Sequence, residues 1–145
     1  MCRDAHAFRG EYIDVCAQIE NWALEMIDEA NDGQKLPYLF GQKLKKVGQL
    51  AAGDTLFSKP MRVRELLERL KPFAELRSKL AHALVQPGSP GTDPIFAFEM
   101  PGAPSPPDDT GRFWLRLSDM NHLISELKKL RKELADQKIK RPPNT

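Results

Sequence analysis

The residues best suited to chemistry in this sequence are an arginine and a histidine in the segment 75–84, where Arg77 precedes His82 by five positions. Apolar residues around them recur every three or four positions, which predicts a helix. On a helix, side chains five residues apart point about 140° apart and lie about 7.5 Å apart along the axis. An arginine stem is long enough to close that gap, so Arg77 and His82 can converge on one small anion.

A purely structural interpretation of the same residues is also open. Arg77 falls on the apolar row of the helix, where a guanidinium must reach the surface or find an acid such as Glu20. His82 would then be an ordinary surface histidine. A similar spacing separates Arg116 from His122, but it begins in a predicted strand and is set aside.

The whole chain has the composition of one globular domain, 1–145, with 41% apolar and 29% charged residues. It has neither an apolar run of bilayer length nor a signal peptide, so we expect the cytoplasm. Cys2 and Cys16 would lie about 21 Å apart on one helix, too far for a disulfide. No spacing typical of zinc ligands or of a phosphate-binding loop occurs, and we expect neither a metal nor a cofactor.

Charge is unevenly distributed although the net value is only +2. Residues 1–34 carry two basic and eight acidic side chains, a balance of −6, whereas residues 35–82 carry eleven basic and four acidic ones, a balance of +7. Two explanations are open. The acidic segment can pack beside the basic one, or the basic face can meet phosphates. Lys43, Lys45 and Lys46 are expected on an outward face.

Hydrophobic periodicity predicts long helices at 6–31, 38–52 and 119–139, the last capped by Ser118. The first of these has a wide apolar stripe, so it is expected to contact more than one neighbour. The last closes the bundle or pairs with a second chain.

A further helix is predicted from Ser58, a possible cap, with Pro60 in its first turn. Pro72 removes a backbone donor and disfavours helical geometry at the residue before it. The helix therefore either kinks there or ends, in which case 73–86 forms a separate short helix carrying Arg77.

Residues 95–100 and 112–117 are predicted to form a β-hairpin, with 101–111 as a flexible proline-rich loop between them. The tail 141–145 is predicted to be disordered. The expected fold is therefore all-α, an up-and-down bundle of four to five helices with a short β-hairpin insertion before the last helix.

This order of elements, together with Arg77, Ser78 and His82, resembles the HEPN superfamily (higher eukaryotes and prokaryotes nucleotide-binding domains). Its members are small helical bundles whose motif is an arginine, a polar residue, and a histidine after four to six intervening positions. Many members have asparagine where this chain has Ser78. The resemblance implies a metal-independent endoribonuclease of toxin or defence type, a dimer with a composite site, and a cognate antitoxin, commonly a minimal nucleotidyltransferase.

The roles that the resemblance implies are those of a proton-transfer site for RNA. Arg77 would clamp the phosphate, His82 would act as acid or base, and Ser78 would bind the phosphate or orient His82. The RNA backbone would follow three lysines, namely Lys43, Lys46 and Lys79. The alternative is a non-catalytic module of the same fold that binds a nucleotide or a protein partner.

Overall fold

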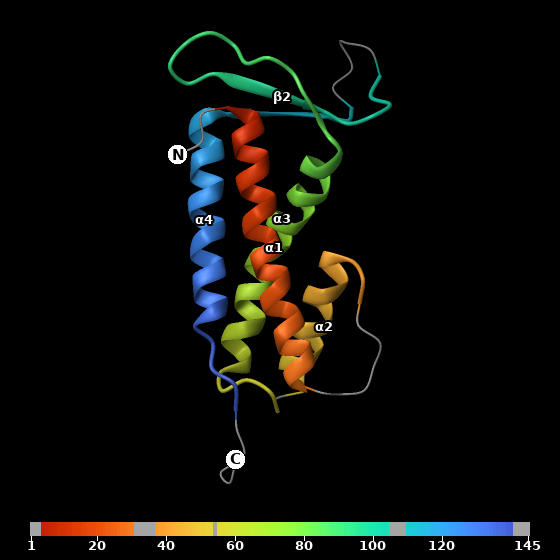
Figure 1. Cartoon of the computed structure of the whole chain (residues 1–145), viewed down its shortest axis with the longest axis vertical. Coiled ribbons are helices and arrows are strands. Elements are labelled where there is room, and N and C mark those ends of the chain that lie inside the picture. The colour runs from red at the N-terminus through yellow and green to blue at the C-terminus, as the bar shows by residue number, and fades with distance from the viewer. Residues whose placement is uncertain (1–3, 31–36, 54, 105–109, 141–145) are drawn as a thin grey trace.

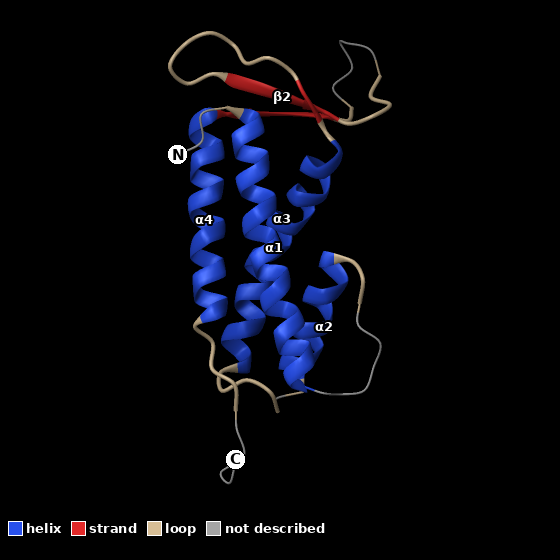
Figure 2. Cartoon of the chain, viewed as in Figure 1, coloured by secondary structure: helices blue, strands red, loops and turns tan. Residues whose placement is uncertain are grey.

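The computed structural model of the chain describes residues 4–30, 37–53, 55–104 and 110–140. Four helices stand side by side, and a small antiparallel sheet lies across one end of them (Figures 1 and 2). The predicted helical bundle with a β insertion before the last helix is confirmed. The middle of the predicted flexible loop 101–111 and the predicted disordered tail 141–145 lie outside the described residues.

Helix α1 (Ala5–Ala30) is the centre of the bundle and contacts each of the other three helices. Its apolar residues recur at helical spacing over the whole length, and this produces a wide buried face, as predicted. Aromatic side chains fill much of the core around it. Phe8 packs against Tyr12 with ring centroids 5.5 Å apart, and Trp22 stacks on Phe57 at 6.3 Å.

Helix α2 (Phe40–Ala52) ends at Gly53, where a stop was predicted. Helix α3 spans Pro60–His82. Its N-terminal capping residue is Lys59 and not the predicted Ser58, so the helix begins one residue later than a cap at Ser58 would give. It then runs without interruption through Pro72, so 73–86 is not a separate helix. The Tyr12 hydroxyl donates a hydrogen bond of 2.7 Å to the Phe73 carbonyl, which ties α1 to α3 directly after the proline.

Helices α1, α2 and α4 (Leu117–Ala135) run away from the sheet, whereas α3 returns toward it (Figure 1). The parallel course of α1 and α4 is also visible in their contacts, since Lys128 pairs with Glu11 and Arg131 donates to Gln18. The predicted up-and-down alternation therefore holds from α2 to α4 but not from α1 to α2. The connection between α1 and α2 is longer than is usual between antiparallel neighbouring helices.

The sheet has three strands in the order β1 (Leu84–Val85), β2 (Ile95–Glu99) and β3 (Arg112–Arg116), and both pairs are antiparallel. The predicted hairpin corresponds to β2 and β3. Strand β1 was not predicted, because two residues are too few to establish a periodic pattern.

Helix α4 starts at Leu117, so the prediction that Ser118 caps it was wrong. The capping residue is Arg116, whose backbone N–H donates to the Asp119 carboxylate at 3.0 Å. Ser118 has a different role. Its backbone N–H and hydroxyl both donate to the Asp93 carboxylate, at 2.8 and 2.7 Å, and so fasten the start of α4 to the segment before β2.

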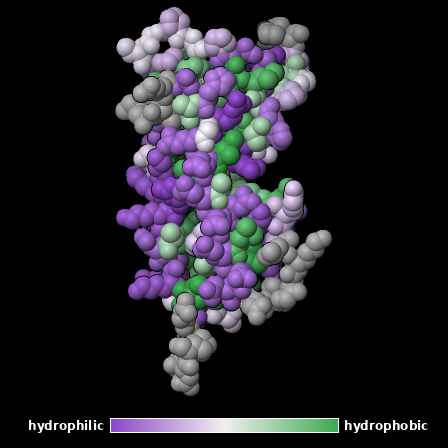
Figure 3. All heavy atoms as spheres, in the orientation of Figure 1, coloured by the Kyte–Doolittle hydropathy of each residue, from purple (hydrophilic) through white to green (hydrophobic). Residues whose placement is uncertain are grey.

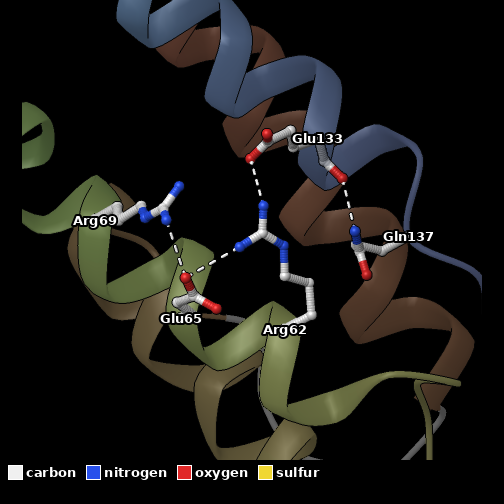
Figure 4. Close-up of polar contacts among 5 residues, drawn as sticks. All are labelled: Arg62, Glu65, Arg69, Glu133 and Gln137. Carbon is white, nitrogen blue, oxygen red and sulfur yellow. Dashed lines mark hydrogen bonds and ion pairs between the residues drawn. The ribbon is translucent and has the colours of Figure 1, made fainter.

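The far end of the bundle is held by a polar cluster (Figure 4). Arg62 at the start of α3 contacts Glu65 at 3.0 Å and Glu133 of α4 at 3.2 Å. On the face seen in Figure 3, hydrophilic residues cover most of the surface and hydrophobic ones are visible mainly between them. Within the described ranges, no helix is long and apolar enough to cross a membrane.

Candidate functional site

The predicted chemistry lies on the last two turns of α3, between the start of α2 and the sheet. Leu80 is fully buried and Ala83 almost so, and these two residues anchor the end of the helix. The helix stops at His82, and the chain continues into β1 through Ala83 in an extended conformation. The guanidinium of Arg9, from α1, donates a 2.6 Å hydrogen bond to the Ala83 carbonyl and so stabilises this transition.

Arg77 points inward, toward α1 and α2. Its Cζ atom lies 5.9 Å from the ring centroid of Phe40, the first residue of α2. Its Nε is buried and finds no hydrogen-bond acceptor among the residues that the structure describes. The acid considered as its partner, Glu20, is instead paired with Lys43. Among the described residues, Arg77 is therefore a half-buried cation with an aromatic neighbour and no counter-charge in contact.

The buried thiol of Cys16 provides a second indication of where the Arg77 charge lies. Burial raises the pKa of Cys16 to about 12, and the positive charge of Arg77 acts on that pKa in the opposite direction. Arg77 is thus close enough to α1 for its charge to be felt there.

Ser78, Lys79 and His82 are all exposed on the outer side of α3. In Figure 1 this end of α3 extends beyond the start of α2 toward the sheet. Arg77 and His82 therefore differ in surroundings, because one side chain is directed into the bundle and the other to solvent. No hydrogen bond joins them in the described part of the chain.

Lys43 was expected to project outward and to bind RNA, and this orientation was wrong. Its side chain is only 10% exposed and pairs with the Glu20 carboxylate of α1. The acidic first helix therefore does pack beside the basic second one, at least at this pair. Lys46 is half-buried, which leaves Lys79 as the exposed member of the three proposed RNA-binding lysines.

A groove of about 920 Å³ runs between α2 and α3 and was not anticipated from the sequence. Gly41 and Gly48 open it on the α2 side, and Leu44, Leu67 and the largely exposed Met61 give it an apolar surface. The nearest atom to a side chain added at Gly48 would be Leu67 Cδ1, at 3.8 Å. Charged residues of both signs lie along its rim.

Two other features of this region could not be read from the sequence. The Arg9–Ala83 hydrogen bond joins residues 74 positions apart, and the Phe40–Arg77 contact joins two helices. Neither pairing leaves a local pattern. In the ranges that the structure describes, no three His, Cys, Asp or Glu side chains gather closely enough to hold a metal ion.

Comparisons of the chain with protein-family models, with curated proteins and with solved structures found no match. The similarity to the HEPN superfamily accordingly depends on Arg77, Ser78, His82 and the order of the elements alone.

Proposed function

We propose that this protein is a metal-independent endoribonuclease of toxin or defence type that acts as a homodimer. The observation that carries the proposal is the uncompensated guanidinium of Arg77, whose buried Nε lacks an acceptor. A buried polar group without a partner is destabilising by about 1–3 kcal/mol, so it calls for an explanation such as a bound ligand. A phosphate oxygen, like a carboxylate, is a charged acceptor that a guanidinium binds through strong hydrogen bonds.

The proposed reaction needs only proton transfer and charge stabilisation. RNA carries its own nucleophile, and the 2′-oxygen attacks the adjacent phosphorus while the bond to the 5′-oxygen breaks. One group accepts the proton of the 2′-hydroxyl and another donates a proton to the departing 5′-oxygen, which leaves a cyclic phosphate. His82 suits either step, Arg77 would bind the phosphate oxygens, and Ser78 would add a hydrogen bond.

A second copy of the chain would supply two things that this reaction needs. One chain supplies a single His82, whereas the reaction uses an acid and a base. Arg77 and His82 of one chain also face different surroundings, so a shared site would combine groups from two protomers. The exposed end of α3, with Ser78, Lys79 and His82, is the surface proposed to meet its copy. A minimal nucleotidyltransferase antitoxin remains part of this proposal.

The test is RNA cleavage in the presence of a chelator, with the product ends analysed by mass spectrometry. We expect cyclic phosphate ends, and we expect His82→Ala to lower the rate by at least the 10²-fold typical of lost acid–base catalysis. His122→Ala is the matched control, because His122 is also exposed and also follows an arginine at similar spacing. Intact RNA with the unmodified protein, or equal loss in both variants, would refute the proposal.

A non-catalytic module is the second candidate, and the α2–α3 groove favours it. A concave, mainly apolar surface with a few polar groups is typical of binding sites for ligands or protein partners. Under this hypothesis, Met61→Asp or Gly48→Leu would abolish partner binding, and neither the original protein nor the variants would cleave RNA. Cleavage that survives both substitutions but not His82→Ala separates the two candidates.

A further inference from the structure

The outer face of the sheet carries a partly exposed tryptophan. Residues directly opposite each other in an antiparallel pair share a face, and Trp114 pairs with Ala97. The face that packs on the helices is marked by Phe98 and Phe113, whose rings stack 4.8 Å apart. Trp114 alternates with Phe113 along β3 and so points the other way. It is 47% exposed.

The neighbours of Trp114 leave one side of its ring accessible and place cations beside it. Ala97 opposite is small, so no large cross-strand side chain covers the indole. Arg112 and Arg116 stand two residues away on either side and on the same face, about 6.8 Å along the strand. Arg112 is fixed by Glu99 at 2.8 Å and by the Pro104 carbonyl. Arg116 is exposed, and the acid shown to interact with its charge is Asp93, whose pKa is lowered by hydrogen bonds from Ser118 and, less, by the charge of Arg116.

The apolar part of this surface is small. Aromatic side chains bury at most about 250 Å², so the exposed part of Trp114 amounts to about 120 Å². Leu84 is the other large exposed apolar residue on the sheet. Together they fall well short of the roughly 800 Å² that each partner contributes to a standard interface. One nucleic-acid base, however, needs only one ring face.

The sheet also continues directly from the candidate site. Strand β1 begins two residues after His82, and Leu84 marks its exposed side. Trp114 lies two strands away from β1, about 10 Å at the usual strand spacing. At the 3.4 Å per nucleotide of one strand in a DNA duplex, about three nucleotides cover that distance.

We propose that Trp114 is a stacking platform for a base of single-stranded RNA, with Arg116 beside the backbone, and that the strand continues over β1 to the last turn of α3. This inference depends on the proposed function for the identity of its ligand. It names the substrate class as single-stranded RNA, because a base inside a duplex does not present its face for stacking on a side chain.

Fluorescence of Trp114 provides a direct test. The chain has two tryptophans, and Trp22 is buried against Phe57, so Trp22→Phe leaves Trp114 as the only reporter. A single-stranded RNA oligonucleotide with 2′-O-methyl groups serves as the probe, because it lacks the nucleophile and cannot be cleaved. We expect saturable quenching on titration, and weaker quenching by the same sequence in a duplex.

Substitution then separates stacking from general attraction. Trp114→Ala should weaken binding about 5- to 150-fold, whereas Trp114→Phe should retain most of it. Met61→Ala is the control, since Met61 is 73% exposed but lies at the other end of α3, away from the sheet. Circular dichroism checks that each variant is folded.

Three results would overturn the proposal that Trp114 is a stacking platform. The first is unchanged RNA affinity in Trp114→Ala, and the second is equal binding of duplex and single-stranded RNA. The third is a fluorescence decrease that follows protein concentration without RNA, which would mean that a second copy of the chain covers this face. The probe binds independently of cleavage, so the two proposals can fail separately. Quenching by the probe with no cleavage of ordinary RNA would support the platform and refute the nuclease.

Discussion

The guanidinium of Arg77 lies over the ring of Phe40, 5.9 Å from its centroid, at the point where α2 begins beside α3. This contact orients a cation that no carboxylate among the described residues neutralises. A cation–π contact stabilises by about 0.5–1 kcal/mol at such a site, less than the penalty of leaving a buried N–H without an acceptor. The folded chain therefore retains Arg77 against a small energetic cost, as we expect if Arg77 is the proposed phosphate clamp.

Arg77→Met should leave the free energy of unfolding within about 1 kcal/mol of the original or raise it, because the lost ring contact is offset by removal of the unpaired N–H. Urea denaturation measures this. Arg69→Met, which removes an exposed arginine paired with Glu65 on the same helix, is the control. A loss above about 2 kcal/mol would mean that Arg77 is a structural cation.

Lys43→Ala should destabilise the protein by about 1–2 kcal/mol, because it leaves the Glu20 carboxylate without its partner between α1 and α2. The estimate is below that for a fully buried pair, since Glu20 is partly exposed. RNA affinity should not change once the fold is accounted for. Lys79→Ala should do the reverse, weakening RNA binding with little effect on the melting temperature. Equal effects of the two substitutions on RNA would contradict the assignment.

Tyr12→Phe removes the hydroxyl that donates to the Phe73 carbonyl. We expect a loss of about 0.5–1.5 kcal/mol, since the partly buried Phe73 carbonyl loses its side-chain donor. Pro72 separately leaves the carbonyl of Glu68, four residues before it, without a helical N–H. Amide hydrogen exchange should show faster opening of 73–82 than of α4. Uniform exchange throughout the bundle would mean that this bond does not hold the second half of α3 in particular.

Stability should fall at alkaline pH through two buried groups of α1. Burial raises the pKa of the Cys16 thiol from 9.0 to about 12 and raises that of the Tyr12 phenol above its usual range. The folded chain retains these protons at a pH where the unfolded chain releases them. Their contribution is therefore complete below pH 9 and is lost as the pH rises toward 12, by up to about 1.4 kcal/mol per unit and group. Cys16→Ala should flatten this slope between pH 9 and 10, and an unchanged slope would exclude the thiol.

Arg62→Ala should cost about 0.5–1 kcal/mol by disconnecting the start of α3 from the end of α4 (Figure 4). Glu133→Gln should cost less, because it weakens only the contact between Arg62 and α4 and leaves the contact between Arg62 and Glu65. Thermal unfolding compares the two. Additive losses in the double variant would show that the pair does not act together.

Local patterns of the sequence were sufficient for most of the elements. The long helices α1 and α4, the place of Pro60 in the first turn of α3, the stop of α2 at Gly53 and the hairpin are all predicted by periodicity and by glycine or proline positions. These signals involve residues within one or two helical turns of each other, so they can be recognised from the sequence alone. Errors occurred at the caps Ser58 and Ser118, where neighbouring residues compete for the same backbone groups.

Relations between elements were decided only by the tertiary structure. The sequence determined that Arg77 and His82 share one helix, but the packing of α1 and α2 directs Arg77 inward and leaves His82 exposed. Periodicity predicts Lys43 on an outward face of α2, yet its side chain is buried between α1 and α2, where it pairs with Glu20. Strand β1 exists because β2 supplies its hydrogen bonds. Each of these outcomes depends on a partner far away in the chain, and the energy of such a contact is not present in any local pattern.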